Sequence, residues 1–344
     1  MEELKAAIDV LARPPWLFSL TVALLLVMVR SRPPWRSTGG LALLIPVVGG
    51  LALALSDPVF RTRALEPERL PVLVLAVAAA ALIWTSIHRA HAAAPEPTPW
   101  SGIAAAEWLL GCGAILTVGL AALLVDLPLE RAPDISRPPL GPRAPWFLLA
   151  FEELGRYFDA PAIRLLMPVL VVATLVALPF LDRGGRDGGG FEDRRGMLTL
   201  GLFAIVALAL LPMLIGAFLR GPHGLAHGPF AVWDPDRPRL PPTLPLSDLV
   251  WGRWLDLAPR SIVLRELPGL LFLVLYFVVL PWQLPRWRPT RAVLGRLLSV
   301  QGRARYHFGM ALVLLMLIVP IKMYGRWLFG VDCLLHLPEW WIHL

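Results

Sequence analysis

The chain has 344 residues, of which 57% are hydrophobic, with a formal net charge of +7 and a mean hydropathy of +0.65. Soluble domains contain about 45–50% apolar residues, so this composition excludes an ordinary water-soluble globular domain. The two cysteines, Cys112 and Cys333, exclude a disulfide framework and the Cys-x-x-Cys-His motif that attaches covalent haem c.

Apolar runs recur along the whole chain and predict where it crosses the membrane. They cover residues 16–30, 40–56, 70–87, 103–125, 161–181, 197–219, 264–284 and 307–324. Most of them approach the ~20 residues that a helix needs to span the hydrocarbon core of a bilayer. We therefore expect an all-α integral membrane protein with about eight transmembrane helices.

Arginines are concentrated in the connections between these runs. The connection 285–306 contains arginines but no acidic residue. Short connections rich in Lys and Arg remain in the cytoplasm. We therefore assign the connection 285–306 to the cytoplasmic side, together with 30–39, 88–102 and 182–196, which share its side of the membrane. The two longest loops, 126–160 and 220–263, then face the opposite side. Positive charge at the ends of spans indicates contact with anionic lipid headgroups, and we expect no nucleic-acid partner.

A b-type haem within a helical bundle requires two imidazoles that face each other from different spans. No histidine falls in the middle of a predicted span; they are His88, His91, His223, His227, His307, His336 and His343. We therefore expect this chain to provide no haem ligand. His88 and His91 have i, i+3 spacing but no neighbouring acid or cysteine that would complete a metal site. The sequence also lacks the GxSxG, P-loop and HExxH motifs.

The loop after the fourth run has the most informative sequence. It contains Asp126-Leu-Pro-Leu-Glu130 and Ala144-Pro-Trp-Phe147, and it ends with Tyr157-Phe-Asp159. The loop resembles the ef loop of cytochrome b, in which a Pro-Glu-Trp-Tyr motif lies on a short helix and forms one wall of the quinol-oxidation site; the resemblance therefore implies a short helix after Pro145. It is similar in more detail to a bacterial branch of split, subunit IV-like cytochrome b chains that read Lys-Ala-Pro-Trp-Tyr-Phe-Leu before a Tyr-Phe-Asp.

Other segments extend this resemblance over most of residues 65–344. They are Met167–Asp182, Phe218-Leu-Arg-Gly-Pro222, Gly228–Pro235, Arg265–Gly269, Tyr276–Pro281 and Pro338-Glu-Trp-Trp341. The resemblance implies a cytochrome b C-terminal-like helix bundle in residues 96–222, with helices E, F and G and the ef loop. Residues 1–95 would form accessory membrane helices, and residues 223–344 a periplasmic loop followed by two C-terminal membrane helices.

The resemblance also implies a function. The chain would be a haem-free subunit of a quinol:cytochrome c oxidoreductase in the bacterial inner membrane, with its ef loop on the periplasmic side. It would share a quinone/quinol site with a haem-b-bearing cytochrome b N-terminal-type subunit. Electrons would pass to the haem b of that partner and to an iron–sulfur or cytochrome c subunit.

The loop departs from the family at one important position, because Pro145 replaces the Glu that is thought to accept a proton from quinol. If the site is active, another acid must take this role. Glu153 is the first candidate, since the related branch keeps a Glu there, and the adjacent Glu152 is the second. The resemblance implies quinol contacts from Pro145, Trp146, Phe147, Phe151 and Tyr157.

Simpler interpretations of these residues remain open. The two glutamates could be helix-end charges, and the aromatic residues could form an interfacial belt. Arg156, and Arg265 with Glu266, could dock a partner, although salt bridges within the loops are the simpler role. Glu107 and Lys322 lie nearest to the hydrocarbon and are expected to extend their charges towards the interface.

Two other functions are compatible with the sequence. One is a structural membrane anchor of a respiratory complex without quinol chemistry, for which Pro145 is the best argument. The other is a transporter subunit. The predicted spans have almost no charge at their centres and show no internal repeat, which argues against transport.

Overall fold

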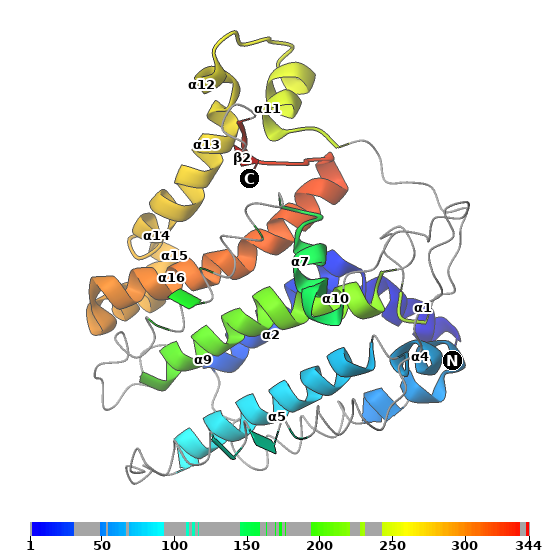
Figure 1. The fold of residues 1–344 in the computed structure, drawn as a ribbon. Helices are drawn as coiled ribbons and strands as arrows, with labels where there is room; N and C mark the ends of the chain where they lie inside the picture. Colours follow the sequence, from blue (N-terminus) through cyan, green and yellow to red (C-terminus); the bar gives the residue numbers. More distant parts are fainter. Residues whose placement is uncertain are drawn as a thin grey trace, which may run out of the picture.

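The computed structural model describes residues 2–30, 49–52, 54–66, 69–92, 108–109, 112–113, 116, 145–158, 163, 169, 172–173, 176, 194–220, 228–230, 243–337 and 342–343. This part of the chain is mostly helical (Figure 1). Its only named strands, β1 (His336–Leu337) and β2 (Ile342–His343), pair antiparallel close to the C-terminus. The predicted helical class agrees with the described residues, apart from this short pair of strands near the C-terminus.

The N-terminal helices α1 (Glu2–Leu11) and α2 (Pro14–Arg30) meet at a sharp bend of 77°. A proline at the start of α2 suits this bend, because it lacks the backbone N–H that would continue the preceding helix. Phe18 and Val22 of α2 are fully buried in the main hydrophobic core. This core also contains residues of α9, α10 and α16, so α2 packs as part of the bundle.

Helix α4 (Pro58–Ala64) is tied to α1 through its capping residue. Asp57 accepts hydrogen bonds from the backbone N–H groups of Val59 and Phe60 at 2.9 and 3.0 Å. Its other carboxylate oxygen lies 2.7 Å from Nζ of Lys5 in α1. The hydrogen bond from Lys5, together with that from the Phe60 amide, holds the pKa of Asp57 below its usual value. Helix α5 (Leu70–Ala92) follows.

The centre of the bundle is a continuous helix made of α9 (Arg194–Ile205), the π-helical η5 (Val206–Leu210) and α10 (Leu211–Phe218). It packs against α16 (Arg296–Tyr324) at Gly309. A Cβ atom at Gly309 would lie 3.3 Å from Cε of Met197, so the glycine permits this close contact. Helix α16 continues into η10 (Gly325–Phe329), which Gly330 ends with φ of 70°.

Residues 243–295 form a helical hairpin that packs on α16. Its elements are α11 (Leu246–Asp248), η7 (Leu249–Trp254), α12 (Ile262–Arg265), α13 (Leu267–Val274), η8 (Leu275–Val279), α14 (Leu280–Gln283), α15 (Arg288–Thr290) and η9 (Arg291–Gly295). The Tyr276 hydroxyl donates to Leu314 O at 2.8 Å, and the Tyr306 hydroxyl donates to Pro281 O at 3.0 Å. These two bonds attach the hairpin to the long helix.

Two helices within the described residues are long and apolar enough to cross a membrane, namely Thr199–Phe218 and Arg288–Phe329. The bent pair α1–α2 makes a third if it counts as one span, while Leu70–Ala81 and Leu267–Gln283 are shorter apolar helices. Membrane association agrees with the sequence prediction. The predicted runs 40–56, 103–125 and 161–181 lie mostly outside the described residues, so the total of about eight spans remains a prediction.

The helix ends are arranged in two groups. The carboxyl end of α5, the amino end of α9 and the short α15 gather at the left of Figure 1. The amino end of α5, the carboxyl end of α10 and the short helix α7 (Leu149–Leu154) lie towards the opposite end (Figure 1). The loop that contains α7 is therefore well separated from the arginine-rich connection around α15.

Candidate functional site

The segment 145–158 forms a short helical loop on the central helix. Pro145 is extended, with φ of −51° and ψ of 150°, and leads into η2 (Trp146–Leu148) and then α7. Helix α7 lies against α10 at Gly216, where an added Cβ would be 3.3 Å from Leu149 O. The predicted short helix after Pro145 is confirmed, and glycine allows it to lie close to α10.

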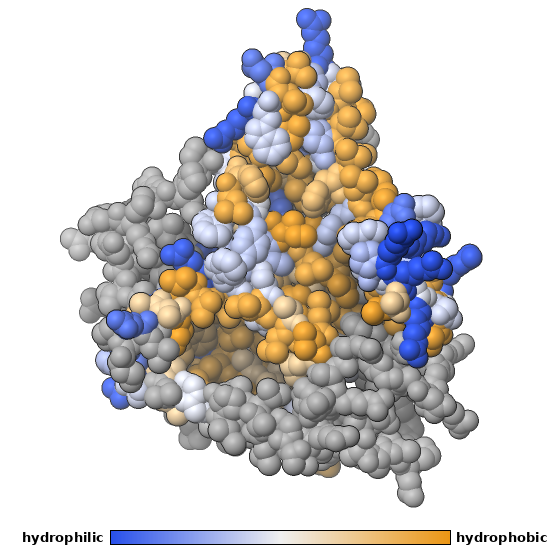
Figure 2. All heavy atoms as spheres, turned by 180° about the vertical axis from the view of Figure 1, so that it is seen from behind, coloured by the Kyte–Doolittle hydropathy of each residue, from blue (hydrophilic) through white to orange (hydrophobic). Residues whose placement is uncertain are grey.

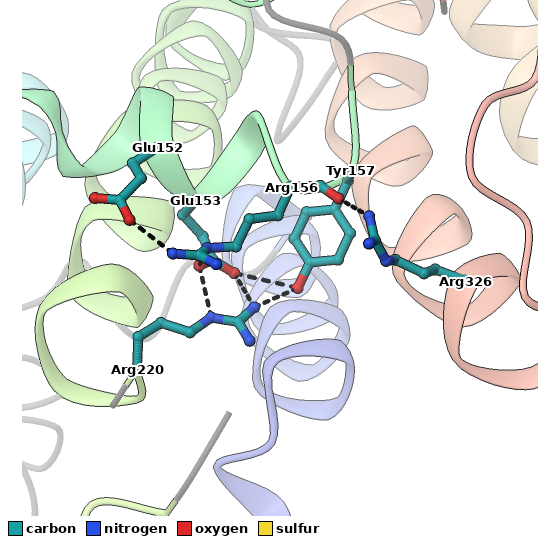
Figure 3. Close-up of polar contacts among 6 residues, drawn as sticks. All are labelled: Glu152, Glu153, Arg156, Tyr157, Arg220 and Arg326. Carbon is teal, nitrogen blue, oxygen red and sulfur yellow. Dashed lines mark hydrogen bonds and ion pairs between the residues drawn. The ribbon is translucent and has the colours of Figure 1, made fainter. Parts of the chain in front are cut away.

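Helix α7 directs Glu153 inward, where its side chain is 0% exposed. Arg220, two residues beyond the end of α10, binds this carboxylate with two nitrogens (Figure 3). Nε of Arg220 donates to Oε2 at 2.7 Å and Nη2 donates to Oε1 at 2.5 Å. A bidentate pair of this kind is among the strongest hydrogen-bonded contacts in proteins, so it fixes the loop to the helix.

Tyr157 completes a buried cluster of three polar side chains. Its hydroxyl donates to Glu153 Oε1 at 3.1 Å and accepts from Arg220 Nη2 at 2.6 Å (Figure 3). Burial, reinforced by the negative charge of Glu153, raises the pKa of Tyr157 well above its usual value. Burial alone would lower the pKa of Arg220, but the carboxylate of Glu153 raises it above the ordinary value. Tyr157 therefore stays neutral and Arg220 stays charged.

Glu152 lies beside this cluster but faces outward, and its side chain is 40% exposed. It forms an ion pair of 2.6 Å with Nη2 of Arg156, one turn further along the chain. Nε of Arg156 also lies 3.5 Å from Oε2 of Glu153, so this arginine bridges the exposed and the buried carboxylate (Figure 3). Glu152 is thus the carboxylate of the two that a ligand could reach.

The C-terminal end of α16 holds the same loop from the other side. In η10, the continuation of α16, Nη1 of Arg326 donates to the backbone oxygen of Arg156 (Figure 3). The same nitrogen lies 3.6 Å from Oδ1 of Asp332. Nζ of Lys322 donates to Asp332 O at 2.6 Å and lies 5.8 Å from the ring centre of Phe158. Loop 145–158 is therefore fixed by both α10 and α16.

Lys322 does not extend towards the interface, so that prediction is wrong. The residue is 2% exposed, and its ammonium group is satisfied by the backbone carbonyl of Asp332. The chain reverses at Gly330 and returns over the helix, which brings this carbonyl within reach. Glu107, for which the same was expected, lies outside the described residues.

The aromatic residues of the loop do not share one surface. Trp146 and Phe147 are exposed and pack edge to face, with ring centres 5.8 Å apart. Phe151 is partly buried against the core, and Tyr157 belongs to the buried polar cluster. Of the residues predicted to contact quinol, only Pro145, Trp146 and Phe147 are exposed.

A second polar cluster surrounds Glu266, which is buried. Its Oε1 lies 3.0 Å from Nε of Arg265, and its Oε2 accepts the backbone N–H of His336 at 2.8 Å. Nη2 of Arg265 donates to His336 O at 3.3 Å, and Trp251 Nε1 donates to Arg265 O at 2.9 Å. These contacts attach the C-terminal tail to the hairpin, which favours the salt-bridge role for Arg265 and Glu266.

The sequence interpretation did not identify the role of Arg220. The residue was noted only as part of Phe218-Leu-Arg-Gly-Pro222, and its partner Glu153 lies 67 positions earlier. An arginine directly after a long apolar run was the available signal, because a charge at this depth needs a partner. His223 and His227 lie outside the described residues, and within the described part no three His, Cys, Asp or Glu side chains gather as a metal site.

The fold and this site define a helical, membrane-associated protein with a buried Glu–Arg–Tyr cluster, in a loop whose Trp146, Phe147 and Glu152 are exposed. Comparisons with protein-family models, with curated proteins and with solved structures find no match to this chain.

Proposed function

We propose that the chain is a haem-free, cytochrome b C-terminal-type subunit of a bacterial quinol:cytochrome c oxidoreductase. It forms part of a quinol-oxidation site that it shares with a haem-b-bearing partner. The periplasmic side of the inner membrane carries the site, and electrons leave through the haems of the partner and an iron–sulfur or cytochrome c subunit.

One observation carries this proposal. The loop that resembles the ef loop and the segment that resembles the exit of helix G are in direct contact, through the bidentate pair of Glu153 and Arg220. The two segments belong to the same resemblance but lie far apart in the sequence. Their contact supports the interpretation of both as parts of one site.

The geometry suggests different roles for the two glutamates. Both carboxylate oxygens of Glu153 are engaged by Arg220, so Glu153 acts as a positioning residue that holds the loop. Glu152 is exposed on the same short helical segment as Trp146 and Phe147. The two aromatic rings would contact a quinol ring, and Glu152 would accept its proton as a general base.

The first experiment identifies the partners of the chain. The tagged chain is purified from its own membranes in mild detergent, and a dithionite-reduced minus oxidised spectrum is recorded. We expect a b-type haem signal that is lost together with a second, histidine-bearing chain. A preparation that contains neither haem nor a redox partner would overturn the proposal.

A second experiment tests the role of Glu152 within the purified complex. General-base catalysis contributes about 100-fold or more, so Glu152→Gln should lower quinol oxidation by at least tenfold. The matched control is Glu66→Gln, because Glu66 is 39% exposed and forms a similar local ion pair with Arg69. The control should retain the wild-type rate. If both variants oxidise quinol at the same rate, Glu152 does not act as the general base.

The structural anchor is the second candidate, and a specific observation favours it. Pro145 occupies the position of the usual acid, and Glu153 is already bound by Arg220 and shielded from solvent. An anchor would purify with haem-bearing partners, but quinol oxidation by the complex would not respond to Glu152→Gln. The two experiments together therefore separate the two functions.

A further inference from the structure

The segment 285–306, named here the basic segment, combines charge and apolar surface in an unusual way. Its arginines are Arg286, Arg288, Arg291, Arg296, Arg303 and Arg305, of which the last is partly buried and the others are exposed. No acidic residue occurs between Pro285 and Tyr306. The surface therefore has a concentrated positive charge that no acid within the segment compensates.

The backbone separates this segment from the apolar helix that follows. Gly302 has φ of 77° and ψ of 170°, a conformation that strongly favours glycine, and it interrupts α16 near its beginning. The long apolar run 307–324 starts after this point, within the candidate span Arg288–Phe329. The basic segment thus forms a separate short helical stretch at the end of a candidate membrane span.

The short stretch is amphipathic, and one of its faces is packed against neighbouring apolar residues. Leu297 is buried with Tyr306 and Met310, and Leu294 and Leu298 pack against them. On the outside, Val293 and Val300 are 58% and 55% exposed. Exposed valines between arginines are unfavourable in water, but they are typical of a helix that lies in the headgroup region of a bilayer.

Two tryptophans lie at the start of the basic segment, Trp282 just before it and Trp287 within it. Trp282 and Trp287 are both exposed, and the guanidinium of Arg286 lies 4.1 Å from the ring centre of Trp282. Exposed tryptophans next to arginines are enriched where a span meets the membrane surface. Figure 2, which views the molecule from behind, shows strongly hydrophilic side chains at the right, where α15 and the start of α16 lie, next to an apolar surface.

We propose that the basic segment is a binding surface for anionic phospholipid headgroups such as phosphatidylglycerol. The arginines bind the phosphate groups, while Val293, Val300 and the two tryptophans contact the upper acyl chains. A soluble polyanion would satisfy the arginines but leave the apolar side chains in water, so a lipid fits this surface better. The proposal concerns a surface remote from the loop 145–158 and requires no quinol chemistry.

The test uses the full chain, purified in neutral detergent and transferred to mixed micelles that contain phosphatidylglycerol or phosphatidylcholine. Thermal unfolding is followed while the mole fraction of lipid is raised. We expect the unfolding midpoint to rise with phosphatidylglycerol and to respond little to phosphatidylcholine. Each arginine near an anionic surface contributes about fivefold in affinity, equivalent to about 1 kcal/mol. Arg288→Gln/Arg291→Gln should therefore need about 25-fold more phosphatidylglycerol for the same response.

Two controls make the result specific. Arg253→Gln/Arg260→Gln removes two exposed arginines from the opposite part of the hairpin and should leave the response unchanged. Arg288→Lys/Arg291→Lys preserves the charge and should preserve most of the response. This variant therefore distinguishes the loss of positive charge from a folding defect caused by replacing the arginines. Equal responses to both lipids, or an unchanged response in Arg288→Gln/Arg291→Gln, would overturn the proposal. Stabilisation by inorganic phosphate or a short oligonucleotide as strong as by phosphatidylglycerol would overturn it too.

Discussion

The pair of Glu153 and Arg220 explains why two charged residues can lie inside an apolar bundle. Removing charges from water costs several kcal/mol per ion, and good geometry with further hydrogen bonds is needed to offset this cost. Here both carboxylate oxygens are bound by the guanidinium, and Tyr157 adds a hydroxyl contact to each partner. The main effect of the pair is to position the loop rather than to add net stability, because the attraction between the two charges mainly offsets the free energy lost when they leave water.

Breaking this pair should be costly. Glu153→Gln and Arg220→Met each leave a buried group without its partner, so each should lower the free energy of unfolding by about 3–5 kcal/mol. Denaturant unfolding in detergent measures the loss, and the double variant should lose clearly less than the sum of the two. Glu152→Gln is the control, because it removes only the outward partner of Arg156 and should cost less than about 1 kcal/mol. Similar losses in Glu153→Gln and in the control would show that the buried pair has no special role.

Cys333 provides a prediction on pH dependence. Burial raises the pKa of its thiol to about 11, above the usual value near ~8.5. The folded state therefore favours the protonated thiol, and the reactive thiolate is rare at neutral pH. In a Cys112→Ala chain, alkylation by iodoacetamide should accelerate about tenfold per pH unit from pH 7 to 9.5 without levelling off. The denatured chain should level off near pH ~8.5, and the same plateau in the folded chain would contradict the burial of the thiol.

The helices and the C-terminal tail make their closest contacts at glycines, which have no Cβ atom. Gly216 lets α7 lie on α10, and Gly309 lets α16 pack against α9. The closest approach is at Gly269 in α13, where an added Cβ would be 1.7 Å from Leu334 O of the tail. The position of the tail on α13 thus depends on the absence of a single methyl group.

Gly269→Ala should displace the tail. Overpacking of this kind costs about 1–3 kcal/mol, and the variant should also alkylate Cys333 faster because the tail separates from the hairpin. Gly252→Ala is the matched control, since a Cβ at Gly252 has no heavy atom within 4 Å. We expect its free energy of unfolding to stay within about 0.5 kcal/mol of wild type. If Cys333 reacts at the same rate in both variants, the contact between α13 and the tail is not tight.

The bundle as a whole joins segments from the entire chain. Residues 1–95 were predicted to be accessory membrane helices, and Phe18 and Val22 of α2 are buried in the same core as α9 and α16. Asp9 of α1 accepts the backbone N–H of Phe230 at 2.9 Å, and Arg63 of α4 donates to Pro229 O at 3.1 Å. The N-terminal helices therefore also hold part of the second long loop.

The sidedness predicted from charge can be tested with single cysteines. Ser299 lies in the basic segment and Ser261 in the hairpin loop predicted to face the periplasm, and both are exposed. In a Cys112→Ala/Cys333→Ala chain, a membrane-impermeant maleimide applied to spheroplasts should label Ser261→Cys. Ser299→Cys should be labelled only after the membrane is permeabilised. The reverse pattern would invert the topology, and the loop 145–158 would then face the cytoplasm.

Local features of the sequence were sufficient to predict part of this structure. The apolar runs 197–219 and 307–324 predicted long helices, because a segment in lipid must satisfy its backbone hydrogen bonds internally and only composition and length matter. The short helix after Pro145 was also predicted, from the similarity of a contiguous motif.

Contacts between distant residues could not be predicted in this way. Glu153 was singled out as a candidate proton acceptor, but its partner Arg220 lies 67 positions away, and no local pattern specifies which charge will meet which. Lys322 was wrongly expected to extend outward, because only the reversal of the chain at Gly330 brings the Asp332 carbonyl to it. Helix formation depends on neighbours in the sequence, whereas the satisfaction of a buried charge depends on neighbours in space, which exist only once the bundle has packed.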